Sequence, residues 1–238
     1  MRRTTGTGKP HRWKIILALT LLTLITTVHL VLQFSDPEGL LTDVTQILLM
    51  PLLAAVLLSR TGIGLGRLTS LVLAALFFSW LGDSLPRFMT GDPAFLTMVG
   101  CFLIAQLFYI LALWPYRASS VLAKPLAVIP YLLALAGLVL WCAPGAGSLL
   151  IPVLVYGVAL TLMAILATGL GPLAGVGGAI FFISDAMIAI RSFTDVDFPD
   201  LGFWIMLSYV LGQSLIVAAV LKRQPSHALG STGRGNNG

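Results

Sequence analysis

Two aspartates lie inside long apolar stretches of the 238-residue chain. Asp83 closes the run Phe77-Phe78-Ser79-Trp80-Leu81-Gly82-Asp83, and Asp185 closes the run Phe181-Phe182-Ile183-Ser184-Asp185. A carboxylate inside a membrane helix costs about 2.5–3.5 kcal/mol of insertion free energy, so such a residue usually marks a functional site. Both aspartates are therefore candidates for catalysis or for proton transfer.

The pair suits two kinds of chemistry. If both carboxylates share one poorly solvated site, they do not both stay ionised, so one serves as an acid and the other as a base. Such a dyad suits cleavage of an enol ether, in which the acid protonates the vinyl carbon. The second carboxylate then stabilises the oxocarbenium ion and activates water. The same two groups would equally suit a proton-coupled transporter.

The elements that must position these aspartates are membrane helices. The chain is 58% hydrophobic and 10% charged, whereas soluble domains carry about 25% charged residues. This composition excludes a soluble globular enzyme and a disordered chain, and 14 scattered Lys and Arg form no basic face for nucleic acid. A bilayer core requires about 20 apolar residues per helix. Eight segments satisfy this length: 14–34, 43–59, 67–88, 95–114, 122–141, 149–168, 173–191 and 201–221.

The basic residues predict the orientation of these eight spans. With eight crossings, all Lys and Arg except Arg87 and Arg191 fall on the side of the two termini, which the positive-inside rule makes cytoplasmic. The sequence therefore predicts an all-α polytopic membrane protein in the inner or plasma membrane. Its parts are a basic cytoplasmic N-terminal segment over 1–13, a single eight-helix membrane domain over 14–221 and a disordered cytoplasmic tail over 222–238.

Further polar residues accompany the aspartates. Asp83 and Asp185 lie roughly 7 and 9 Å from the outer ends of their spans at 1.5 Å per residue, and His29 and Asp43 lie near the same depth. We expect a polar cavity there, open to the outer half of the membrane. The predicted substrate-binding or supporting residues are His29, Asp43, Ser79, Arg87, Gln106, Tyr109, Tyr209 and Gln213.

Each of these supporting residues also has a purely structural interpretation. Asp83 and Arg87 are one helical turn apart and would neutralise each other as an ion pair. Asp43 would favour the helix dipole at the start of its span, and His29 would be an interfacial residue. The glutamines and tyrosines would join helices by hydrogen bonds.

The two aspartate runs suggest an internal repeat. Each is followed one helix later by a glutamine in an apolar run, Gln106 or Gln213. This pattern predicts two four-helix halves in the same orientation, with a binding site where they meet. Three scattered histidines and two cysteines predict no metal site and no cofactor.

Four motifs resemble the YhhN-type lysoplasmalogenase family over about residues 40–221: Leu81-Gly82-Asp83, Gly100…Gln106-Leu107-Phe108-Tyr109, Ser184-Asp185 and Tyr209…Gln213. The resemblance implies an eight-helix membrane hydrolase that cleaves the vinyl-ether bond of lysoplasmalogens to a fatty aldehyde and a glycerophospho-alcohol. It matches Asp83 and Asp185 to the family's proposed catalytic acids. The chain departs from the family at Gln46-Ile47, where many members have Lys-Pro, and at Gln106, where many have histidine. Both departures bear on headgroup contacts and substrate identity.

The sequence thus favours a lysoplasmalogenase-like ether hydrolase whose partners are the membrane and a lysophospholipid substrate within it. A proton-coupled small-molecule transporter that uses the same aspartates is the alternative, and a non-catalytic lipid-binding or scaffold protein is a third. The sequence does not indicate an oligomeric state.

Overall fold

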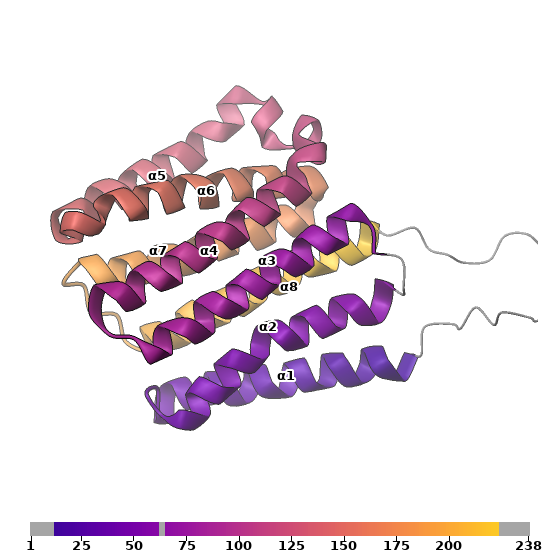
Figure 1. The fold of residues 1–238 in the computed structure, drawn as a ribbon. Helices are drawn as coiled ribbons and strands as arrows, with labels where there is room; N and C mark the ends of the chain where they lie inside the picture. Colours follow the sequence, from indigo (N-terminus) through magenta and orange to yellow (C-terminus); the bar gives the residue numbers. More distant parts are fainter. Residues whose placement is uncertain (1–11, 62–64, 224–238) are drawn as a thin grey trace, which may run out of the picture.

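The computed structural model describes residues 12–61 and 65–223, and this part of the chain is all helical, without a strand. Its eight long helices follow the predicted spans to within a few residues (Figure 1). They are α1 (Arg12–Ser35), α2 (Leu40–Thr61), α3 (Arg67–Ser84), α4 (Gly91–Leu113), α5 (Pro125–Ala146), α6 (Leu150–Ala167), α7 (Pro172–Phe193) and α8 (Leu201–Arg223). The predicted terminal segments 1–13 and 222–238 lie outside the described residues, except that 12–13 and 222–223 are helical.

Among the described residues, seven helical stretches are long and apolar enough to cross a membrane, which makes the chain a multi-pass membrane protein. The number is seven because the 46 residues Pro125–Leu170 form one uninterrupted helical run that contains both α5 and α6. The sequence Pro144-Gly145-Ala146-Gly147 favours a turn, and the predicted span ended at residue 141, but α5 continues to Ala146. The chain reverses at Gly147, whose φ of 48° is a conformation that glycine adopts at little cost.

The helices form a bundle in which distant parts of the sequence lie side by side (Figure 1). The α1–α2 pair forms one edge and the α5–α6 pair the other, with α3, α4, α7 and α8 between them. Among the contacts between the two halves of the chain, α4 packs on α6 and α2 packs on α8. In the predicted repeat, α2 corresponds to α6 and α4 corresponds to α8. The α4–α6 contact is therefore the counterpart of the α8–α2 contact.

A pair of glycines allows the closest helix contact near the aspartates. A Cβ built at Gly177 of α7 would lie 2.8 Å from the carbonyl oxygen of Gly212 of α8. Small residues permit such backbone approach between membrane helices. The contact brings Tyr209, one turn before Gly212, against Phe181 of α7, with ring centroids 5.6 Å apart.

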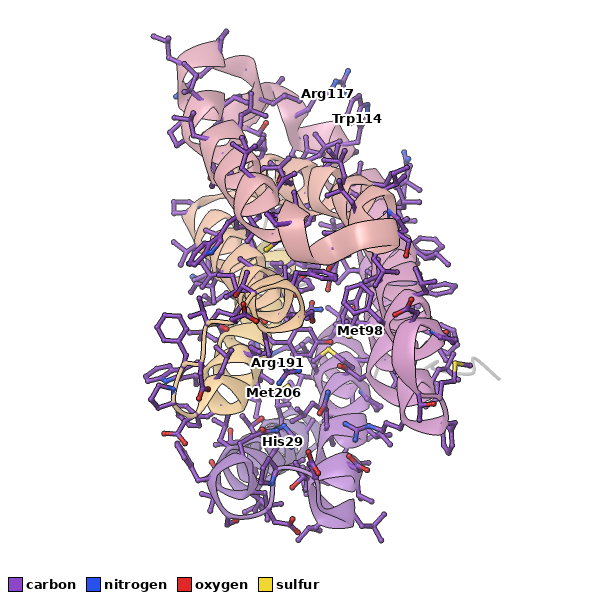
Figure 2. The ribbon with its side chains drawn as sticks, turned by 90° about the vertical axis from the view of Figure 1, so that its left-hand side faces the viewer. His29, Met98, Trp114, Arg117, Arg191 and Met206 are labelled. Carbon is purple, nitrogen blue, oxygen red and sulfur yellow. The ribbon has the colours of Figure 1, made fainter. Side chains whose placement is uncertain are left out.

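The outer surface of the bundle is apolar. Leu126, Leu140 and Ile151 are 82%, 75% and 72% exposed, which in water would be an aggregation liability but in a bilayer is the normal lipid contact. Figure 2 shows such side chains projecting all around the ribbon. The polar side chains that remain inside the bundle therefore need an explanation of their own.

Candidate active site

Asp83 lies in the last turn of α3 and is 9% exposed. The Tyr209 hydroxyl of α8 donates a hydrogen bond to its Oδ2 at 2.8 Å, and Gln46 Nε2 of α2 donates to its Oδ1 at 3.2 Å. Two other helices thus hold both carboxylate oxygens. Gly82 helps to place the residue, because a Cβ there would lie 2.7 Å from the Phe102 ring of α4.

Asp185 lies in α7, about two turns before its end, and is also 9% exposed. The Tyr156 hydroxyl of α6 donates a hydrogen bond to its Oδ2. Its other oxygen accepts no hydrogen bond from any residue in 12–61 or 65–223. This oxygen is the one available to a bound molecule.

Phe102 of α4 connects the surroundings of the two aspartates. Its ring makes an edge contact with Tyr209, the donor to Asp83, with centroids 5.8 Å apart, and it lines a cavity together with Asp185 and Tyr156. The structure therefore brings the predicted acid pair into one aromatic-lined region between α3, α7 and α8. Such surroundings strengthen electrostatic interactions because they exclude water.

Three of the predicted supporting residues form a separate hydrogen-bonded chain. The Tyr109 hydroxyl of α4 donates to Gln213 Oε1 of α8, and Gln213 Nε2 donates to Ser79 Oγ of α3 at 3.2 Å. Tyr109, Gln213 and Ser79 are fully buried. Ser79 therefore contacts Gln213 and does not orient Asp83, and the chain joins three helices, as in the structural interpretation of these residues.

Gln106 of α4 is different, because neither polar atom of its fully buried amide has a hydrogen-bond partner among the described residues. It lies beside the Tyr156 hydroxyl. An unsatisfied buried amide costs about 1–3 kcal/mol, so it usually faces water or a ligand. Gln106 thus supplies one free donor and one free acceptor next to the Asp185 pair.

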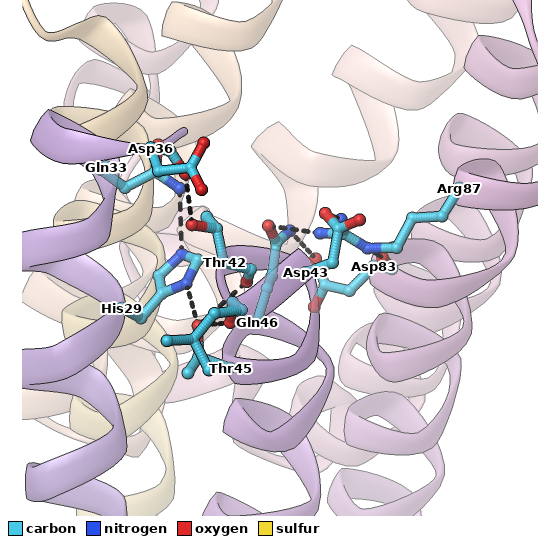
Figure 3. A network of polar contacts seen from close by, with 10 residues as sticks. His29, Gln33, Asp36, Thr42, Asp43, Thr45, Gln46, Asp83 and Arg87 are labelled. Atoms are coloured by element: carbon cyan, nitrogen blue, oxygen red, sulfur yellow. Dashed lines mark hydrogen bonds and ion pairs between the residues drawn. The ribbon is translucent and has the colours of Figure 1, made fainter. Parts of the chain in front are cut away.

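A second polar cluster lies where α2 begins and α3 ends (Figure 3). Arg87 forms an ion pair with Asp43, donates to Gln46 Oε1 at 2.7 Å and donates to the backbone oxygen of Asp83 at 3.0 Å. The proposed Asp83–Arg87 ion pair was thus the wrong pairing, because Asp43 from the neighbouring helix takes the guanidinium. Gln46 links this cluster to the Asp83 carboxylate.

His29 lies to one side of this cluster and makes no hydrogen bond to Asp83 or Asp185. Figures 2 and 3 show the ring directed into the bundle between α1 and α2, where it is fully buried. Gln33 Nε2 donates to its Nε2 at 3.2 Å, so its Nδ1 donates to Thr45 Oγ1 at 3.0 Å. His29 is therefore buried between helices and links α1 to α2.

Two residues of the site were missing from the predicted set, Tyr156 and Gln46. Tyr156 places a hydroxyl group within the apolar run Leu154-Val155-Tyr156-Gly157. A tyrosine in an apolar run is the signal that identified Tyr109 and Tyr209. Gln46 had been noted only as a departure from the resembled family. Its contacts with both Asp83 and Arg87 make it a central part of the site.

The chemistry available to these groups is that of proton transfer. In residues 12–61 and 65–223, no three His, Cys, Asp or Glu side chains lie together as a metal site. The two carboxylates, the two tyrosines that hold them and the free Gln106 amide are the reactive and polar groups of the region.

The Arg87 contacts predict a stabilising role. Arg87→Gln should lower the free energy of unfolding by about 2 kcal/mol, because it removes hydrogen bonds of a charged group to Asp43, Gln46 and Asp83. The measurement is the thermal midpoint in detergent micelles. Arg191→Gln is the matched control, because Arg191 is exposed near the end of α7. Equal midpoints for the two variants would contradict the prediction.

Comparison with known proteins finds a family whose model matches most of this chain. The model of the YhhN family matches residues 41–220. Curated relatives named lysoplasmalogenase from Mycobacterium bovis and Mycobacterium tuberculosis are each 36% identical over 173 residues, which is 69% of this chain and 66% of theirs. A relative named lysoplasmalogenase TMEM86B from Sus scrofa is 30% identical over 72% of each chain. The chain thus spans just under two thirds of the length of the mycobacterial relatives, and no solved structure matches it significantly.

Proposed function

The chain belongs to the YhhN family, and from that premise we propose that it hydrolyses the vinyl-ether bond of a lysoplasmalogen. The products are a fatty aldehyde and a glycerophospho-alcohol. Relatives at 30–36% identity that are named lysoplasmalogenase support this substrate class. The substrate is a lysophospholipid that reaches the site from the bilayer.

The observation that carries the proposal is the pair of buried aspartates, each held by a tyrosine from another helix. Asp83 accepts hydrogen bonds from Tyr209 and Gln46, whereas Asp185 accepts one from Tyr156 and keeps one oxygen free. Donors that bind both oxygens of a carboxylate favour its ionised form. We therefore assign the role of base to Asp83 and the role of acid to Asp185.

The reaction then proceeds in balanced steps. Asp185 donates its proton to the vinyl carbon remote from the ether oxygen, which leaves an oxocarbenium ion that the Asp83 carboxylate stabilises. Asp83 takes a proton from a water molecule as that water adds to the cation. The hemiacetal so formed breaks its bond to the glycerol oxygen, which gains a proton as the aldehyde leaves. The glycerol oxygen takes the proton that Asp83 received from the water, and the hemiacetal hydroxyl gives its proton to Asp185, which restores both aspartates to their starting states.

The transporter alternative requires a polar route across the whole bundle. Beyond the site, toward the ends of the helices nearest the termini, the core contains Leu57, Leu113 and Leu166, all fully buried. This apolar layer favours a site that opens at one end only. It therefore supports the hydrolase over the transporter.

The direct test is aldehyde release by the purified protein from a lysoplasmalogen in detergent or vesicles. The matched control substrate carries a saturated 1-alkyl ether, which has no vinyl carbon to protonate and should yield no aldehyde. Rates should be equal with and without a chelator, because the proposed steps use no metal. Absence of aldehyde from the vinyl ether would overturn the proposal.

We further propose eight membrane crossings with both termini cytoplasmic, the antiparallel α5 and α6 each providing one crossing. The support is the segregation of all Lys and Arg except Arg87 and Arg191 to one side. A cysteine at Asp197, in a background without Cys101 and Cys142, should react with an impermeant maleimide in intact cells. Lys124→Cys is the control and should react only after permeabilisation. The reverse pattern would contradict this orientation.

A further inference from the structure

An apolar cavity lies between α5, α6 and α7, and Asp185 and Tyr156 line it. We propose that this cavity binds the hydrocarbon chain of the lipid while its ether group is at the aspartates. The inference rests on the proposed function and goes further, since it assigns a chain-binding subsite and the residues that set its length.

The lining of the cavity fits a hydrocarbon and no polar ligand. Apart from Asp185, Tyr156 and Cys142, every lining residue is aliphatic, aromatic or glycine. Ligand pockets are mostly apolar with a few placed polar groups, and this lining has that character. Here the polar groups are those that would meet the vinyl ether, so the rest of the cavity is left for the chain attached to it.

The cavity also extends in the direction that a chain requires. Phe182 precedes Asp185 by three residues, and Leu160 follows Tyr156 by four residues on an antiparallel helix. At 1.5 Å per residue both lie roughly 5 Å from the carboxylate toward the middle of the bundle. Leu135, in the middle of α5, lines the same end. Cys142, Ala146 and Leu150 line the opposite end of the cavity, toward the α5–α6 turn. In the proposed pose, the chain starts at Asp185 and takes the end that points toward the bilayer centre.

A second cavity supplies the approach to the carboxylate. It lies between α4, α6 and α7, and it shares Asp185 and Tyr156 with the first. Phe95 and Phe193 line its outer end, with ring centroids 5.2 Å apart. Asp185 thus lines both cavities. In the proposed pose, the glycerol side of the substrate occupies this outer cavity, and the chain occupies the end of the first, inner cavity that Leu135, Leu160 and Phe182 line.

Gly157 offers a way to shorten the inner cavity. A Cβ at this position would lie 2.9 Å from the end of the Leu135 side chain, which can rotate away. Gly157→Leu should therefore fill the deep end without moving the backbone. Val158→Leu is the matched control, because Val158 is the next residue of α6, is 50% exposed and does not line the cavity.

The measurement is kcat/KM for lysoplasmalogens whose 1-alkenyl chains have about four or about eighteen carbons. Each buried methylene improves binding about fourfold, so exclusion of three of them should lower the long-chain value about 60-fold. The short-chain value should change by less than about threefold, and Val158→Leu should leave both values unchanged. A Gly157→Leu enzyme with an unchanged ratio of the two values would overturn the inference.

A binding measurement on the unmodified protein keeps the inference separate from the activity. The probe is a saturated 1-alkyl lysolipid with a diazirine at the end of its chain, which the enzyme should bind without cleaving. Photolysis should label peptides of α5, α6 and α7 that contain Leu135, Leu160 or Phe182. Labelling confined to the outer cavity, or spread evenly over the lipid-facing surface, would refute the chain site even if aldehyde release were normal. Conversely, correct labelling without aldehyde release would refute only the proposed reaction.

Discussion

Asp83→Asn and Asp185→Asn should each lower the rate of vinyl-ether hydrolysis by about 10²- to 10⁴-fold, the usual contribution of general acid–base catalysis. An asparagine occupies the same space but does not cycle a proton. The double variant should lose little more than either single variant, because residues that act as a unit are strongly non-additive. The measurement is aldehyde release by the three variants under saturating substrate.

Stability distinguishes this loss from a folding defect. In Asp83→Asn and in Asp185→Asn, the new side-chain amide would keep one carbonyl oxygen as an acceptor for the tyrosine hydroxyl, and Arg87 would keep its ion pair with Asp43. Thermal midpoints should therefore stay near that of the parent protein. Asp197→Asn, which changes an exposed acid, is the control for both measurements. Near-normal turnover by Asp185→Asn, or losses that simply multiply in the double variant, would contradict the dyad.

Tyr156→Phe and Tyr209→Phe should each reduce kcat by about 10- to 100-fold with little change in KM. Each removes one hydroxyl that holds a carboxylate, and hydrogen bonds to charged groups are worth about 1.5–3 kcal/mol. Tyr156→Phe should have the larger effect. Among the described residues, the Tyr156 hydroxyl is the one hydrogen-bond donor to Asp185, whereas Asp83 still accepts a hydrogen bond from Gln46 when Tyr209 is changed. Tyr131→Phe, on α5 and outside both cavities, is the control.

A cycle tests whether these tyrosines act through the aspartates. In the Asp185→Asn background, Tyr156→Phe should cause no further loss, since the residue it positions no longer carries a proton. Independent losses in that background would show that Tyr156 contributes by another route. The same logic applies to Tyr209→Phe combined with Asp83→Asn.

The helices of this protein follow from local chemistry. Long apolar segments have no alternative in a bilayer, because every backbone polar group must be satisfied within the segment. The spans therefore agreed with α1 to α8 at nearly every boundary. The exception was the end of α5, where the proline and glycine of Pro144-Gly145 suggested a turn that the chain makes only at Gly147.

The sequence also determined which residues are functional candidates, because a carboxylate such as Asp83 or Asp185 is costly in an apolar segment wherever the helix packs. It did not determine their partners. Intrahelical spacing predicted Arg87 for Asp83, but the guanidinium pairs with Asp43 of α2, and Tyr209 and Gln46 hold the carboxylate. Spacing fixes the neighbours of a side chain within its own helix only. The neighbours across the bundle depend on how closely two helices approach and on how each is rotated about its axis. Contacts such as Gly177–Gly212 decide both. These contacts exist only in the packed bundle.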